Sequence, residues 1–275
     1  MLPWSKSGCR LMEDTLHDQL DLEYRRIQRQ LASFLFRLTA SREEAEDLVQ
    51  ETFTKAVEKV RQFRGESTLK TYLFSIASNL AYDHLKERKR WGADAQDRAR
   101  TIAESRPEVE AELNRIHRES PAGAYEFTEH IDFCFTCVSR VLRLDRQISV
   151  LLKEIYGFSD GEIALILGKS ESVIKHHLHD ARRDLREIFE GRCALVGKQG
   201  PCWQCSELNG YFNGKQAEAE RKRVAESEKK SSDLDHLLNL RLEMIRQIDP
   251  LNARGSDLHD YFMRMTRSGM ENTPL

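Results

Sequence analysis

Apolar residues in the first third of the chain recur at spacings of three and four, and this period restricts the fold more than any other feature. In residues 16–38 they form one stripe, made of Leu16, Leu20, Tyr24, Ile27, Leu31, Phe34, Leu35 and Leu38. Such spacing follows the turn of an α-helix and not the alternation of a strand. Similar patterns follow Ser41 and Thr68, so we expect three amphipathic helices that close into a bundle.

The expected start of the second helix carries a local signal. Glu44 lies three residues after Ser41, which is the spacing of a capping box. Gly65 interrupts the apolar pattern further on, and Ser67 or Thr68 can cap the third helix.

A second helical block occupies residues 146–189. Ser159 and Glu162 have the spacing of another capping box, Gly168 ends a short helix, and Ser170 caps a long one. Two helices joined by a short glycine-containing turn are typical of a helix-turn-helix. We expect the long helix to present these DNA-facing residues: Ser170, Ser172, Lys175, His176, His179, and, toward phosphates, Arg182 and Arg183.

Composition sets broader limits. The 275 residues suffice for two small domains, and 32% of them are charged. The net charge of −2 does not mark a nucleic-acid binder, but it combines a basic segment, 86–100, with an acidic one, 104–132. Neither a signal peptide nor a stretch of about 18 apolar residues is present, so we expect a cytoplasmic protein with no membrane contact and reduced thiols.

Two segments resemble a known family. The run AEDLVQETFTKAVEKVRQFRGESTLKTYLFSIASNLAYDHLKERKR is similar to region 2 of bacterial sigma factors of the extracytoplasmic-function (ECF) type. The run YGFSDGEIALILGKSESVIKHHLHDARRDL resembles region 4 of the same family. The resemblance implies an all-α sigma factor that binds the β′ and β subunits of core RNA polymerase, directs it to promoter DNA and performs no catalysis. An anti-sigma protein is a further candidate partner.

The resemblance also implies site residues. One face of the second helix would dock on the β′ coiled coil through Asp47, Leu48, Gln50 and Glu51, although a merely solvated acidic face is the alternative. The third helix and the loop before it would separate the DNA strands at the minus-ten promoter element and read its bases. The residues implied are Lys70, Thr71, Tyr72, Asn79, Asp83, Arg88, Lys89 and Arg90. Region 4 would read the minus-thirty-five element, but Val173, His177 and Asp180 depart from the family's frequent residues, so the preferred DNA sequence does not follow.

The cysteines stand outside this resemblance. His130, Cys134 and Cys137 share one face of a helix, and a CWQC pair follows the second block. Zinc prefers four thiolate or imidazole ligands, so we expect a site made of Cys134, Cys137, Cys202 and Cys205, with His130 or Cys193 as substitutes. The His-x3-Cys-x2-Cys spacing also resembles that of zinc-binding anti-sigma proteins. A redox thiol switch and simple core packing remain open.

We therefore expect four parts: the region 2 bundle (1–91), an acidic linker (92–129), the helix-turn-helix domain (130–190) and a cysteine-containing extension (191–275). In the extension, an amphipathic stripe after residue 233 needs a surface to cover. A helix-turn-helix regulator that acts without polymerase is the alternative function, but it leaves the first block unexplained. A thiol oxidoreductase lacks the expected alternating strands.

Overall fold

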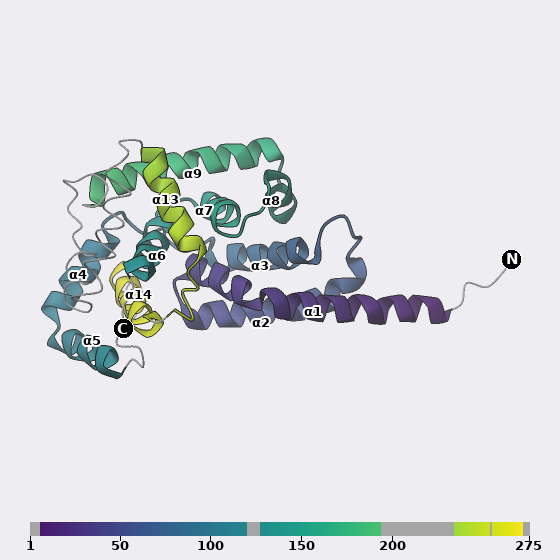
Figure 1. Ribbon diagram of the computed structural model, residues 1–275, viewed down its shortest axis with the longest axis horizontal. Coiled ribbons are helices and arrows are strands. Elements are labelled where there is room, and N and C mark those ends of the chain that lie inside the picture. Colours follow the sequence, from purple (N-terminus) through teal and green to yellow (C-terminus); the bar gives the residue numbers. More distant parts are fainter. Residues whose placement is uncertain (1–5, 120–126, 194–233, 254, 272–275) are drawn as a thin grey trace.

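The computed structural model describes residues 6–119, 127–193, 234–253 and 255–271, and every regular element in these ranges is a helix (Figure 1). The all-α prediction is therefore confirmed. Cys202 and Cys205 lie outside the described residues.

The N-terminal bundle consists of α1 (Lys6–Thr39), α2 (Arg42–Lys59) and α3 (Leu69–Leu85), with a 3-10 turn, η1 (Val60–Gln62), after α2. The three helices pack against one another, and the apolar stripe of α1 is buried at Leu20, Ile27 and Leu31. Helix α1 begins ten residues before the predicted stripe, and its N-terminal part extends beyond the other helices (Figure 1).

The capping box expected at α2 is only half formed. The Ser41 hydroxyl accepts a hydrogen bond from the Glu44 amide at 3.3 Å, as predicted. The Glu44 carboxylate does not return this bond, because it binds Arg88 and Arg267. Thr68 caps α3 and accepts a hydrogen bond from the Thr71 amide at 3.1 Å.

The segment predicted as an acidic linker contains two helices, α4 (Ala95–Ser105) and α5 (Pro107–Glu119). Both pack against the last helix of the described chain, α14 (Ser256–Glu271). This stretch is thus part of the packed body.

The helix-turn-helix domain follows, with α6 (Phe127–Ser139), α7 (Leu144–Val150), a π-helical turn η2 (Leu151–Ile155), α8 (Asp160–Leu167) and α9 (Glu171–Arg192). The second capping box is confirmed: Ser159 accepts from the Glu162 amide at 3.2 Å and donates its own amide to the Glu162 carboxylate at 2.9 Å. Gly168 ends α8 with a φ of 60°, a left-handed conformation that glycine adopts without steric cost.

Two extension helices, α13 (Leu234–Arg246) and α14, complete the fold. Helix α13 lies across α6, η2 and α9, and α14 packs against α4, α5 and α6 (Figure 1). The stripe that needed a surface is buried there at Leu237, Leu238 and Ile245.

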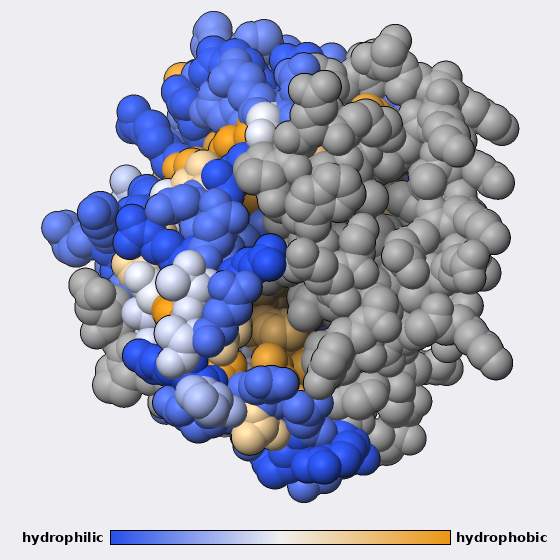
Figure 2. All heavy atoms as spheres, turned by 90° about the vertical axis from the view of Figure 1, so that its left-hand side faces the viewer, coloured by the Kyte–Doolittle hydropathy of each residue, from blue (hydrophilic) through white to orange (hydrophobic). Residues whose placement is uncertain are grey.

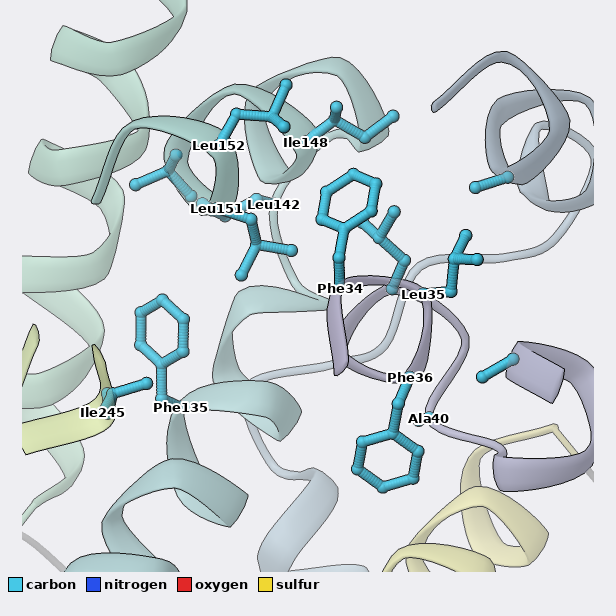
Figure 3. Close-up of a cluster of buried hydrophobic side chains, with 14 of the residues drawn as sticks. Phe34, Leu35, Phe36, Ala40, Phe135, Leu142, Ile148, Leu151, Leu152 and Ile245 are labelled. Atoms are coloured by element: carbon cyan, nitrogen blue, oxygen red, sulfur yellow. The ribbon is translucent and has the colours of Figure 1, made fainter. Parts of the chain in front are cut away.

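The bundle, the helix-turn-helix domain and the extension helices share one hydrophobic core. Figure 3 shows Phe34 and Leu35 of α1 close to Ile148 and Leu152, with Phe135 of α6 and Ile245 of α13 in the same cluster. On the face seen in Figure 2, hydrophilic side chains cover most of the outer coloured surface. Because their buried side chains belong to one core, the two predicted DNA-reading domains are packed together rather than separate.

Candidate nucleic-acid and partner interfaces

The predicted polymerase-docking face of α2 is a polar, acidic surface. Asp47, Gln50 and Glu51 are exposed, and Glu51 forms an ion pair with Lys55 one turn along the helix at 2.8 Å. Leu48, grouped with them in the sequence, is only 5% exposed, because one residue of helix turns it by about 100° toward the core. In this structure the acidic face consists of the three polar residues.

The start of α3 is engaged in contacts within the bundle. The Thr71 side chain is 2% exposed, and its hydroxyl lies 2.9 Å from that of Thr68. The Tyr72 hydroxyl donates to the Ala56 carbonyl at 3.3 Å, and its ring packs on Phe63. Thr71 is thus a structural residue here and cannot touch DNA without a rearrangement.

Lys70 of α3 contacts the helix-turn-helix domain. Its ammonium lies 4.7 Å from the centre of the Phe158 ring and donates to the Tyr156 carbonyl at 3.5 Å. Burial lowers the pKa of Lys70, and the nearby Arg26 lowers it further. The second domain therefore covers part of the predicted DNA contact, and Lys70 is half-buried.

The basic end of α3 divides into exposed and engaged residues. Asn79, Asp83 and Lys89 are exposed. Arg88 forms an ion pair with Glu44 at 3.0 Å. Arg90 donates to the Leu142 carbonyl at 2.7 Å, and burial, followed by repulsion from Arg140, lowers the pKa of Arg90 to about 9.

The N-terminal half of α9 is open. Ser170 accepts a hydrogen bond from the Val173 amide at 3.4 Å as the N-cap. Ser172, Lys175, His176 and His179 are all exposed on the side of α9 away from the buried Ile174 and Leu178. The start of a recognition helix is the part that reaches base edges, so this geometry suits DNA reading.

The arginines further along α9 are occupied by carboxylates. Arg182 binds Glu154 and also donates to the Asn239 side chain at 2.6 Å. Arg183 pairs with Asp184 at 2.8 Å, and Arg186 pairs with Asp235 at 2.8 Å. Asn239 and Asp235 belong to α13, and no local sequence signal points to them.

Of the predicted zinc ligands, His130, Cys134, Cys137 and Cys193 lie within the described residues. His130, Cys134 and Cys193 line one small cavity between α6 and α9, together with Gln96 and Phe189. The Cys137 thiol instead lies 3.8 Å from the sulfur of Met263 on α14. Within the described ranges no group of three or more histidine, cysteine, aspartate or glutamate residues is arranged to hold a metal.

A three-helix bundle with one acidic face, packed against a helix-turn-helix domain, defines a two-part, DNA-binding class of helical protein. The family model for sigma-70 region 2 matches residues 23–91, and that for sigma-70 region 4 matches residues 134–185. The RNA polymerase sigma factor YlaC of Bacillus subtilis is 30% identical over 172 residues, which are 62% of this chain and 91% of YlaC. The sigma-H factor of Pseudomonas aeruginosa is 28% identical over 173 residues, or 63% of this chain and 86% of that protein.

Among solved structures, the sigma factor RpoE of Bartonella quintana, in complex with the anti-sigma factor NepR, aligns with a TM-score of 0.44 at 26% identity. That alignment covers 62% of this chain and 97% of RpoE. The sequence matches are sufficient: this chain belongs to the RNA polymerase sigma factors of the ECF type. It is a factor that binds core RNA polymerase and directs promoter recognition and transcription initiation. No helix in the described ranges is long and apolar enough to cross a membrane.

Proposed function

We propose that the two open surfaces divide the work of this sigma factor between polymerase and promoter. The acidic face of α2, with Asp47, Gln50 and Glu51, docks on the β′ coiled coil. The N-terminal half of α9 enters the major groove of the minus-thirty-five element, and its exposed Lys175 carries the strongest single argument. A lysine at this position can donate to guanine O6 and N7. The protein acts in the cytoplasm and without catalysis of its own.

The proposal extends to the minus-ten element through α3. Asn79, Asp83 and Lys89 are already exposed, whereas Lys70, Arg88 and Arg90 must leave their present partners to reach DNA. Tyr72 supplies an aromatic ring for base stacking once α3 is free. Contact with β and with an anti-sigma protein is part of the same proposal and rests on family resemblance.

The test is reconstituted transcription. The full-length protein, added to core polymerase, should direct run-off transcription from promoters selected from a randomised DNA library. Lys175→Ala should remove the selected minus-thirty-five preference, while an exposed control on the same helix, Glu187→Ala, should retain it. Loss of preference in neither variant would place the DNA contact elsewhere.

We also propose that the cysteines form a zinc or thiol site between α6 and α9. The support is that His130, Cys134 and Cys193 border one cavity, two of them with the soft sulfur ligands that zinc favours. Cys202 and Cys205 are the predicted additional ligands. Cys137 faces Met263, so of the four cysteines predicted from the sequence it is the least suited to bind the metal.

Elemental analysis of protein purified under reducing conditions tests this second proposal. We expect about one zinc per chain, and loss of it in Cys134→Ser and in Cys202→Ser/Cys205→Ser. Cys137→Ser serves as the comparison, since its thiol lies against Met263. A folded wild type without metal, and without a thiol that oxidises reversibly, would leave the cysteines as packing residues.

A further inference from the structure

The helix-turn-helix domain covers one side of α3. Its Phe74 packs edge-on against Phe158 with ring centres 4.9 Å apart, and the Ser75 hydroxyl donates to the Ile166 carbonyl of α8 at 3.2 Å. Lys70 adds its contact with Phe158 and Tyr156. One side of the predicted minus-ten reading helix is thus occupied by the domain that reads the other promoter element.

This packing is incompatible with binding both promoter elements at once. Elements near minus ten and minus thirty-five are about 25 base pairs apart, or about 85 Å along B-DNA at about 3.4 Å per base pair. Helix α3 packs on α8, and α8 packs on α9, as Figure 1 shows. Since packed helix axes lie about 8–10 Å apart, the two reading helices are separated by about 20 Å where they are layered. The described arrangement must therefore open before transcription begins.

The extension helices connect the two domains in this arrangement. At one end, Arg246 of α13 binds Glu154, which also holds Arg182 of α9. At the other end, Arg267 of α14 binds Glu44 of the bundle, and the two side chains are 16% and 18% exposed. The extension is therefore anchored to the helix-turn-helix domain, where Asp235 and Asn239 of α13 add their contacts with α9, and also to the bundle.

The turn between α13 and α14 makes a third connection at the junction. The Ile248 carbonyl accepts from Arg37 of α1 at 2.9 Å, and the Leu251 carbonyl accepts from Arg42 of α2 at 3.2 Å. Beside this turn lies an open pocket of about 230 Å³, bordered by α1, η2 and the turn itself. The turn thus adds polar contacts from the extension to α1 and α2, beside the hydrophobic core that the three parts share.

Glu271, near the end of α14, makes further contacts with the end of the bundle and with α6. It accepts from the Trp91 indole at 2.9 Å and forms an ion pair with Arg140 of α6 at 2.8 Å. Trp91 directly follows the basic end of α3. These contacts therefore hold the end of the bundle against α6. Each of these ties joins the extension to the bundle or to the helix-turn-helix domain.

We propose that the extension helices α13 and α14 are an autoinhibitory clamp. They hold the bundle and the helix-turn-helix domain against each other, so that α8 and Phe158 stay packed on one side of α3 and the free sigma factor stays closed. Release of the clamp exposes Lys70 and allows the two domains to separate to the distance that a promoter requires. Because apparent affinity scales with the fraction of binding-competent molecules, a tenfold larger open fraction tightens polymerase and promoter binding about tenfold.

The clamp can be tested in the full chain by reversing the charge of its anchors. Arg267→Glu brings a new carboxylate against Glu44 and Glu271, and Arg246→Glu does the same against Glu154. Arg264→Glu is the matched control, because Arg264 is on α14, 55% exposed, and pairs with Asp260 of its own helix at 3.3 Å. All three variants change the net charge equally.

Small-angle X-ray scattering and binding to a core polymerase–promoter mixture are then measured on variants that retain wild-type helical circular dichroism. A compact wild type of this length has a radius of gyration of about 19 Å. We expect Arg267→Glu and Arg246→Glu to increase this radius and to bind more tightly, up to about tenfold, with Arg264→Glu unchanged. Both variants remaining as compact and binding as weakly as the control would overturn the clamp, as would an opened variant that binds no better. If no form binds polymerase, the docking proposal fails, while the scattering result still decides whether the extension holds the domains together.

Discussion

Arg37 of α1 and Asp132 of α6 form a buried ion pair at 2.9 Å, with side chains 1% and 2% exposed. They are 95 residues apart in the sequence and belong to the two domains that a sigma factor uses on DNA. The Arg37 guanidinium also donates to the Tyr156 hydroxyl at 2.7 Å and to the Ile248 carbonyl. One side chain thus connects the bundle, the helix-turn-helix domain and the extension.

Replacing Arg37 should destabilise the whole closed molecule. Arg37→Met leaves the Asp132 carboxylate buried without its partner, which costs about 3–5 kcal/mol in comparable buried pairs. The double variant Arg37→Met/Asp132→Leu should regain much of this free energy, since neither charge remains to be desolvated. Urea denaturation of the three proteins measures both changes, and equal stabilities of the single and double variants would contradict this account.

The acidic face of α2 gives a prediction about polymerase. Reversing the charge of Asp47 together with Glu51 should abolish core polymerase binding and leave the fold intact, since both side chains are exposed and the core side of α2 is complete without them. A pull-down with core polymerase measures this. The same reversal at Glu108 and Glu110, exposed residues at the start of α5, is the control for net charge. Retained binding by a folded Asp47/Glu51 variant would leave a solvated face as the correct interpretation.

Local signals made the helix-turn-helix predictable. Ser159, Glu162, Gly168 and Ser170 act within one helical turn of their own positions, so their spacing alone determines where α8 and α9 begin and end. The apolar stripe of α1 was predictable for the same reason, because helical periodicity is a property of contiguous residues.

Long-range partners were not predictable from these signals. Glu44 has the spacing of a capping box, but its carboxylate binds Arg267, which is 223 residues away. Residues 92–129 look like an acidic linker by composition, yet α4 and α5 pack against α14. From the sequence near α3, Lys70 and Arg90 look like DNA contacts. Only the packing of the two domains shows that Lys70 contacts the Phe158 ring and that Arg90 donates to the Leu142 carbonyl.

Two of the cations of α9, Lys175 and Arg186, should behave differently toward DNA. Lys175 is exposed near the start of the helix, whereas Arg186 forms an ion pair with Asp235 of α13 at 2.8 Å. Lys175→Ala should weaken binding to a specific promoter by about 1–3 kcal/mol and spare random DNA. Arg186→Ala should change promoter binding less. Fluorescence anisotropy with both DNAs measures these effects, and equal losses on both DNAs would make Lys175 a phosphate contact only.

The buried histidine of α14 makes stability depend on pH in a defined direction. His259 is 7% exposed, and burial lowers its pKa from about 6.5 to about 3. Its neighbours are Glu129, 3.9 Å from Nδ1, and His130, whose pKa burial also lowers. Between pH 6.5 and 3 the unfolded chain binds a proton at this position that the folded chain excludes, so stability is full above pH 6.5 and decreases on acidification.

At pH 5 the loss from His259 alone should be about 2 kcal/mol relative to pH 7. The measurable quantity is the slope of the unfolding free energy against pH, obtained from urea denaturation between pH 5 and 7.5. His259→Gln should reduce this slope by nearly one proton equivalent near pH 5 and by progressively less toward pH 7.5, whatever it does to the stability at neutral pH. His236→Gln, at an exposed position on α13, is the matched control substitution. Because His259 holds α14 against α6, an unaltered slope in His259→Gln would mean that this contact is already open to solvent in the folded protein.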